Sequence, residues 1–312
     1  MELEEALVLS ARSGHFLLHF KDGRTAQAAA RKKVMSASQN MHQIIAGDEV
    51  MVSFQNDAYT IEKRLKRKTF VSRGSGKRRG RVHAIVANVD HAILVFAANK
   101  PRSRVGGIDR YLVACEYQHL DVSLVFNKWD LSDKESEELA EIYSKAGYSV
   151  LKTEALIRSD EARGLILDLP FKKLYVMGPS GVGKSSLLNA IFDEEAKAVT
   201  GAVNEVSGKG RQTTTHIELC PLGDGRFVSD TPGLGHLIML GIEPHNLKNF
   251  FREFQDLSDN CRYQNCLHID EPQCAVKDEI GESVHVERYQ SYLDFYSDLC
   301  DEYDKTKVKG RH

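Results

Sequence analysis

Residues 173–186 read KLYVMGPSGVGKSS, an apolar run that passes through a glycine-rich turn into a further apolar stretch. The turn matches G-x-x-x-x-G-K-S, and its flanks predict a strand before it and a helix after it. Such a turn binds phosphate, because its glycines let successive N–H groups point at phosphate oxygens and the helix adds its positive end. The predicted nucleotide-binding residues of this loop are Gly178, Pro179, Ser180, Gly181, Val182, Gly183, Lys184, Ser185 and Ser186.

Two side chains of this loop carry most of its chemistry. We expect Lys184 to reach the β- and γ-phosphates of a nucleotide and the Ser185 hydroxyl to bind Mg²⁺. The alternative is a glycine-rich turn that contains Lys-Ser by chance, which happens in a chain of this length on the order of one time in a hundred. The predicted strand and helix on either side favour nucleotide binding.

A second motif, N-K-W-D, follows the apolar run at 122–126. Its residues are Asn127, Lys128, Trp129 and Asp130. Asp130 can accept hydrogen bonds from both N1–H and the exocyclic amine of guanine, a pattern that adenine lacks. Asn127 would tie this loop to the phosphate loop, and the stem of Lys128 could stack on the base. Alone, N-K-x-D is often a turn with a helix cap, but beside a phosphate loop it predicts GTP. Residues 153–155 follow the next predicted strand and match the usual third base-binding loop only weakly.

Two more segments are predicted to sense the γ-phosphate. D-T-P-G begins at Asp230, whose carboxylate would hold Mg²⁺ through water while the N–H of Gly233 meets the γ-phosphate. A hydroxyl of Thr213 or Thr214 would complete the Mg²⁺ coordination, and the sequence does not choose between them. A plain turn is the alternative for D-T-P-G. The predicted catalytic residues are Lys184, Ser185, Thr213, Thr214, Asp230 and Gly233.

The order of these motifs is unusual. Common GTPases end on N-K-x-D, whereas here that motif precedes the phosphate loop. Strands and helices alternate from residue 81 onward, with the first strand expected at 84–86, which predicts an α/β sheet that is mostly parallel. Every motif still follows a strand and would lie at the same edge of that sheet. Residues 73–240 are therefore predicted to form a circularly permuted P-loop GTPase domain.

Residues 1–72 predict a small N-terminal β-barrel. Five short strands separated by turn signals fit an OB-fold, a barrel that often binds nucleic acid. A β module for protein contacts is the alternative. Ten Lys and Arg residues lie between positions 63 and 81. Such a run is usually a solvated linker, but it would still attract phosphates and favours RNA as the partner.

Residues 241–312 are predicted to form a zinc-binding and helical domain. The ligands have the spacing C-x₄-C-x-H-x₅-C and are Cys261, Cys266, His268 and Cys274. Three thiolates and one imidazole suit a closed tetrahedral zinc site, and ligand type favours zinc over iron. Unrelated cysteines or disulfides are the alternative, which a reducing compartment disfavours. Residues 284–304 predict a helix that packs through a stripe including residues 286, 289 and 292.

Composition sets broad limits. The 312-residue chain is 42% hydrophobic with a net charge of −2, as in ordinary globular proteins, so its overall charge gives no sign of a nucleic-acid partner. No apolar run approaches the length of a membrane span, and the acidic N-terminus does not fit a signal peptide. We therefore expect a cytoplasmic protein with no membrane partner.

The order barrel, permuted GTPase and Cys₃His module resembles the ribosome small-subunit-dependent GTPase A (RsgA) family, also called YjeQ or YloQ. The resemblance spans nearly the whole chain and is carried by NKWD, GPSGVGKSS, GRQTTT, DTPG and the Cys₃His spacing. It implies a GTPase that acts late in maturation of the 30S subunit, binds its 16S rRNA and hydrolyses GTP faster when bound there. Its implied cofactors are GTP or GDP, Mg²⁺ and one Zn²⁺ per chain, and a monomer is expected.

The residue that orients the attacking water is not evident. Ras-like enzymes place Gln directly after D-x-x-G, where this chain has Leu234, and some relatives place His where it has Gly241. His216 and His236 are the nearby candidates. We therefore expect slow intrinsic turnover, with a partner supplying or ordering the missing group. An RNA-binding adaptor that uses GTP as a structural ligand is the alternative, whereas Asp130 disfavours an ATP-dependent enzyme.

Overall fold

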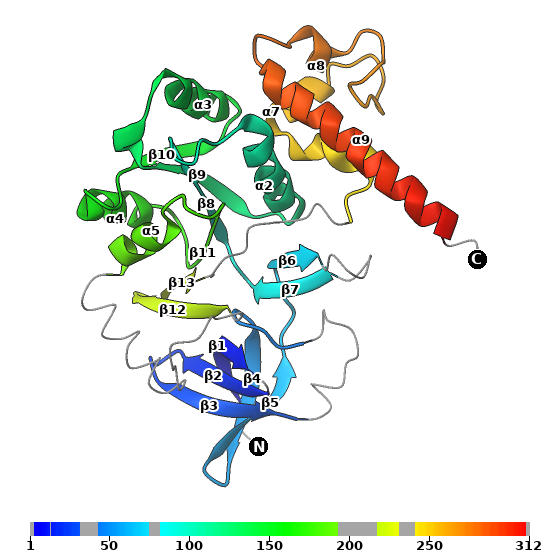
Figure 1. Cartoon of the computed structure of the whole chain (residues 1–312). Helices are drawn as coiled ribbons and strands as arrows, with labels where there is room; N and C mark the ends of the chain where they lie inside the picture. The colour runs from blue at the N-terminus through cyan, green and yellow to red at the C-terminus, as the bar shows by residue number, and fades with distance from the viewer. Residues whose placement is uncertain are drawn as a thin grey trace.

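One sheet of eleven strands runs through the N-terminal and central parts of the molecule (Figure 1). Its order is β10-β9-β8-β11-β13-β12-β1-β2-β3-β5-β4. The structure is a computed structural model, and it describes residues 3–12, 14–31, 43–74, 82–192, 217–230 and 241–309. Among the helices of these residues, none combines the length and apolar character needed to cross a membrane.

The first five strands form a closed barrel, because β1 pairs with both β2 and β4. Successive side chains of a strand point to opposite faces, so every second residue fills the barrel interior. In β2 these residues are Phe16, Leu18 and Phe20. The parallel pairing of β3 with β5 completes the strand order of an OB-like barrel, as predicted. These strands are β1 Glu4–Arg12, β2 His15–Phe20, β3 Thr25–Ala30, β4 Glu49–Gln55 and β5 Ala58–Arg64.

The central part is a mostly parallel α/β layer, with an antiparallel hairpin of β12 and β13. Strand β8 is buried along its whole length, because α2 and α3 cover the face of Leu94 and Phe96 while α4 and α5 cover the face of Ile93 and Val95. The strands are β8 His91–Ala97, β9 Asp121–Asn127, β10 Ser149–Thr153, β11 Lys173–Met177, β12 Glu218–Gly223 and β13 Arg226–Asp230. The helices are α2 Val105–Tyr117, α3 Lys134–Lys145, α4 Ser159–Leu167 and α5 Lys184–Ile191.

The junction between barrel and α/β layer differs from the prediction in one element. The strand expected at 84–86 is part of β7 Val82–Ala87, which does not join the parallel sheet but pairs with β6 Phe70–Gly74 as a separate hairpin. The basic run is therefore not a linker throughout. Val71 and Val86 explain the hairpin, because both are fully buried in the core beneath α2.

The C-terminal module, drawn in yellow, orange and red in Figure 1, packs on α2. Val113 of α2 lies in one apolar cluster with Phe251, Phe254 and Tyr292 of the module. The predicted helix at 284–304 is present as α9, although Val286 is exposed and does not belong to the packing stripe. The elements of the module are η3 Pro244–Phe250, α7 Arg252–Ser258, α8 Ala275–Asp278 and α9 Val286–Lys309.

Candidate nucleotide-binding site and metal centre

The phosphate loop lies between β11 and α5, as its sequence predicts. Gly178 has φ +148°, and a Cβ there would lie 2.0 Å from the carbonyl oxygen of Val95 on the neighbouring strand. Gly183 has φ +96°, and a Cβ there would lie 2.1 Å from the side-chain nitrogen of Asn127. Both glycines are therefore required by close packing as well as by backbone conformation.

Lys184 bends back over this loop. Its Nζ donates to the carbonyl oxygens of Gly178 and Pro179, at 2.9 and 2.5 Å. Burial lowers the pKa of its ammonium group from the ordinary value. Together with Ser185, Lys184 opens α5, whose first turn contains no acidic residue, so the positive end of this helix faces the loop without an internal counter-charge.

Asn127 joins three loops at the same edge of the sheet. It is buried at the end of β9, and its Nδ2 donates to the carbonyl oxygen of Val182 at 3.1 Å. Its Oδ1 accepts from the Thr153 hydroxyl at 3.1 Å and from the Ala155 N–H at 3.0 Å. The structure thus brings N-K-W-D against the phosphate loop. The site also includes residues 153–155 at the end of β10. Their sequence matches the usual third base-binding loop only weakly, so their position in the chain was the only signal.

Lys128 makes a second connection. It has a left-handed backbone with φ 59°, and its Nζ donates to the carbonyl oxygens of Gly181 and Lys100, at 2.6 and 2.7 Å. Asp130 follows in the short 3₁₀ turn η2 Trp129–Leu131, where its side chain is exposed. Within the described residues, no hydrogen bond or ion pair holds the Asp130 carboxylate.

The γ-phosphate-sensing segments are only partly described. Asp230 ends β13, which runs parallel to β11, so its backbone lies at the same edge of the sheet as the phosphate loop. Its side chain lies outside the described part of the structure. Also outside the described residues are Thr213, Thr214, His216, Gly233, Leu234 and His236. Their assigned roles stay predictions.

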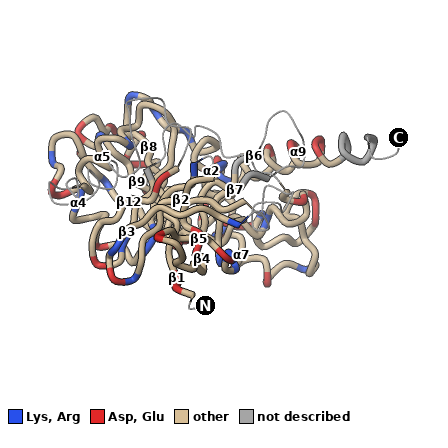
Figure 2. The backbone as a smooth tube through the Cα atoms, turned by 90° about the horizontal axis from the view of Figure 1, so that it is seen from below, with Lys and Arg blue, Asp and Glu red and all other residues tan. Residues whose placement is uncertain are grey.

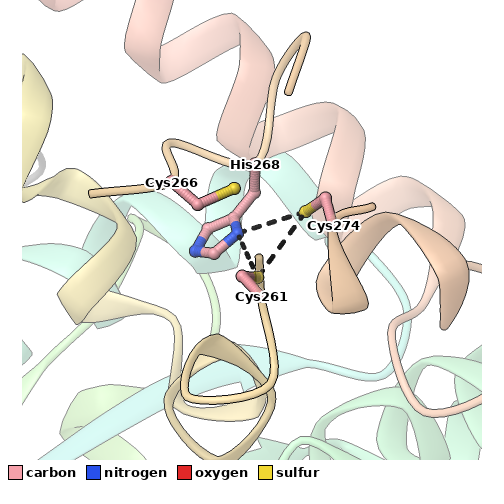
Figure 3. Close-up of side chains that lie close together, drawn as sticks. All are labelled: Cys261, Cys266, His268 and Cys274. Atoms are coloured by element: carbon pink, nitrogen blue, oxygen red, sulfur yellow. Dashed lines mark hydrogen bonds between the residues drawn. The ribbon is translucent and has the colours of Figure 1, made fainter. Parts of the chain in front are cut away.

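The four predicted metal ligands converge in the C-terminal module (Figure 3). The ligand atoms of Cys261, Cys266, His268 and Cys274 all lie within 4.8 Å of one another. His268 Nδ1 lies 3.6 Å from the Cys261 sulfur and 3.3 Å from the Cys274 sulfur, and these two sulfurs are 4.0 Å apart. Tetrahedral zinc with ordinary bond lengths would separate two sulfurs by about 3.8 Å and a sulfur from a nitrogen by about 3.5 Å. The spacing therefore fits zinc.

The protonation of these ligands also suits a metal. The Ser258 hydroxyl donates to the carbonyl oxygen of Phe254 at 2.6 Å, so it accepts from His268 Nε2 at 3.1 Å and leaves Nδ1 free to bind. Burial lowers the pKa of His268 to about 4, which keeps the imidazole neutral at pH 7. Burial raises the pKa of the Cys266 thiol, so its thiolate form needs a cation beside it.

The loop around the cluster is fixed by its own hydrogen bonds. His268 has a left-handed backbone with φ 62°. The carboxylate of Glu271 accepts from the N–H groups of Leu267 and Ile269, at 2.7 and 3.0 Å. The hydroxyl of Tyr289 on α9 donates to the carbonyl oxygen of His268 at 2.7 Å. These hydrogen bonds hold the loop that carries the four ligands.

Comparisons with known proteins agree with this architecture. A family model described as RsgA GTPase matches residues 64–239. The small ribosomal subunit biogenesis GTPase RsgA of Phocaeicola vulgatus is 31% identical over 94% of this chain and 96% of its own length. The protein with the same name from Shouchella clausii is 35% identical over 96% of this chain and 99% of its own.

Two solved structures share the fold. The crystal structure of YjeQ from Thermotoga maritima superposes with a TM-score of 0.77 at 31% identity, covering 96% of this chain and 99% of that one. YloQ, described as a circularly permuted GTPase, gives a TM-score of 0.75 at 27% identity, covering 96% of each chain. The chain therefore belongs to the RsgA GTPase family, a family of GTP hydrolases with circularly permuted motifs.

Proposed function

We propose that this chain is a cytoplasmic, monomeric GTPase that binds the small (30S) ribosomal subunit during its late maturation. It hydrolyses GTP to GDP and phosphate, and the subunit stimulates its turnover. The curated relatives that carry the name of a small ribosomal subunit biogenesis GTPase support this role. The single observation that carries it is the convergence of N-K-W-D on the phosphate loop through Asn127 and Lys128.

The residues of this site divide the work of binding. The exposed carboxylate of Asp130 accepts from the guanine edge, and Lys128 supports the base with its stem. The N–H groups of residues 178–183 and the ammonium of Lys184 bind the phosphates. Ser185, Thr213 or Thr214, and Asp230 through water would hold Mg²⁺, which would neutralise charge on the phosphates.

The barrel and the basic run between residues 63 and 81 bind 16S rRNA. Figure 2 shows Lys and Arg mixed with Asp and Glu along the described backbone, so this local run rather than a global field supports phosphate binding. The barrel is also continuous with the GTPase part. Ser10 of β1 pairs with Glu218 of β12, and Arg12 forms an ion pair with Glu218 at 3.2 Å. Since β12 leads through β13 to Asp230, contact of the barrel with RNA can bias the segment that senses the γ-phosphate.

The C-terminal module is the third unit. We assign residues 1–72 to the barrel, 73–240 to the GTPase and 241–312 to this module, with one Zn²⁺ held by the Cys₃His cluster. Arg288 of α9, buried with its side chain only 2% exposed, forms ion pairs with Asp109 of α2 and Glu253 of α7. Arg252 bonds Glu116 at 2.6 Å and lies 4.3 Å above the Tyr148 ring. These contacts anchor the module on α2.

Nucleotide-dependent docking tests this proposal. Purified 30S subunits are pelleted with the full chain in the presence of GDP or of a non-hydrolysable GTP analogue. We expect tighter binding with the analogue, because the γ-phosphate orders the segments that sense it. Equal affinity in the two states would contradict the proposed cycle. The alternative is an RNA-binding adaptor with GTP as a structural ligand. It predicts that the subunit leaves the rate of GTP hydrolysis unchanged.

A further inference from the structure

Among the described residues, the carboxylate assigned to guanine has no partner of its own. Asp130 is exposed, and within the described residues nothing holds its side chain by a hydrogen bond or an ion pair. Its position therefore depends on the η2 turn, in which the N–H groups of Leu131 and Ser132 donate to the carbonyl oxygens of Lys128 and Trp129. Whatever fixes this turn also fixes the backbone from which the carboxylate projects.

Two side chains, Phe126 and Lys152, form a clamp on Trp129, the residue directly before Asp130. The indole of Trp129 meets the ring of Phe126 edge-on, with centroids 6.4 Å apart, and packs against the core beneath α2 and α3. The Nζ of Lys152 lies over the same indole, 4.3 Å from its centroid, within the range of a cation–π contact. Lys152 is itself held by Glu137 of α3, at 2.9 Å.

We infer that Trp129 and Lys152 are positioning residues for guanine selectivity: the ammonium of Lys152, held by Glu137, and the ring of Phe126 together hold the indole and so fix the turn that carries Asp130. This inference rests on the proposed role of Asp130 in guanine binding. Neither N-K-x-D itself nor the phosphate loop requires an aromatic residue at position 129 or a lysine at position 152. The clamp therefore adds a determinant beyond those two motifs.

The exposure of the clamp separates positioning from stability. The side chains of Lys152 and Glu137 are 43% and 56% exposed, and exposed ion pairs contribute little to folding stability. Removal of the ammonium should thus leave the fold intact while it loosens the turn. The Lys145–Glu141 ion pair, at 2.8 Å, is a matched control, because it also involves a glutamate of α3. Lys145 lies at the C-terminal end of α3, away from the N-cap residue Asp133.

The test compares GDP with IDP, which lacks the exocyclic amine and so gives Asp130 one donor instead of two. Dissociation constants are measured by calorimetry on the full chain with Mg²⁺. We expect Lys152→Met to reduce the preference for GDP over IDP by about threefold, whereas Lys152→Arg and Lys145→Met keep the wild-type ratio. An unchanged ratio in Lys152→Met would overturn the inference. If instead the wild type shows no preference, or Asp130→Ala keeps it, the role proposed for Asp130 fails.

Fluorescence provides a second readout. Trp129 is the one tryptophan of the chain, so its emission reports on this turn alone. Lys152→Met should change the intensity of that emission, and Lys145→Met should not. Identical emission spectra for the wild type and Lys152→Met would mean that the ammonium does not lie over the indole in solution, which would equally overturn the clamp.

Discussion

The side-chain amide of Asn127 donates to the carbonyl oxygen of Val182 at 3.1 Å, although 55 positions separate the two residues in the chain. This contact joins the end of β9 to the phosphate loop. It shows how a permuted order of motifs still produces one site, because β9 and β11 end at the same edge of the sheet with β8 between them.

Asn127→Ala is expected to weaken GDP binding by at least about tenfold and to lower the free energy of unfolding by about 2 kcal/mol, because it removes three hydrogen bonds from a buried site. Calorimetry and urea unfolding measure the two effects. Asn88→Ala is the matched control. Asn88 is also buried and bonds the Gly47 carbonyl oxygen and the Lys68 N–H, but it lies at the barrel junction. The Asn88→Ala variant should be less stable than the wild type and keep the wild-type affinity for GDP. A wild-type GDP affinity in Asn127→Ala as well would refute this prediction.

Gly183→Ala should abolish tight GDP binding, since its Cβ would meet Asn127 Nδ2 at 2.1 Å. Gly223→Ala separates this clash from backbone strain. Gly223 has φ +89°, but nothing lies within 4 Å of a Cβ there. The control should cost about 1 kcal/mol of stability and leave nucleotide affinity intact. Equal nucleotide affinities for the two variants would show that the clash with Asn127 does not cause the loss of GDP binding.

Ser258→Ala should weaken zinc binding by about 10- to 100-fold, because His268 Nε2 loses the acceptor that fixes its tautomer. Competition with a chromophoric chelator measures the affinity. Ser283, whose hydroxyl bonds the exposed Glu279 carboxylate at 2.8 Å, provides a control that should behave as wild type. A wild-type zinc affinity for Ser258→Ala would mean that another group orients the imidazole.

Arg288→Met should destabilise the protein by about 3–5 kcal/mol at pH 8, since it leaves the buried Asp109 and Glu253 without their cation. Burial already raises the pKa of Asp109 to about 6 against the opposing pull of Arg288. Loss of the cation raises that pKa further. A carboxyl group with a folded pKa above its unfolded value loses stability as pH rises, so the cost of the substitution should be smaller at pH 5 than at pH 8. Urea midpoints at both pH values test this; a larger cost at pH 5 would contradict it.

The elements that could be predicted from the sequence are those whose signal is local. Period-2 alternation marks the barrel strands, and each nucleotide or zinc motif lies within a short segment. The joining of barrel and α/β layer could not be predicted, because β1 pairs with β12, through Ser10 and Glu218, across a long stretch of sequence. The ion pair of Arg288 with Asp109 spans 179 positions, and a charged residue in a helix ordinarily indicates a solvated face.

The basic run was the other source of error. Its charge is typical of a linker, yet Val71 within it is fully buried and makes β6 a strand of the hairpin with β7. Only the pairing with Val86 identifies the strand, and that partner lies beyond the glycine-rich part of the run.

GTP hydrolysis by the purified full chain, alone and with 30S subunits, tests the central claim most directly. We predict slow turnover alone and stimulation by the subunit of at least about tenfold, with the stimulation lost in Lys184→Ala and Ser185→Ala. Tight GTP binding with turnover that 30S subunits leave unchanged would contradict the account and favour an adaptor that holds GTP as a structural ligand.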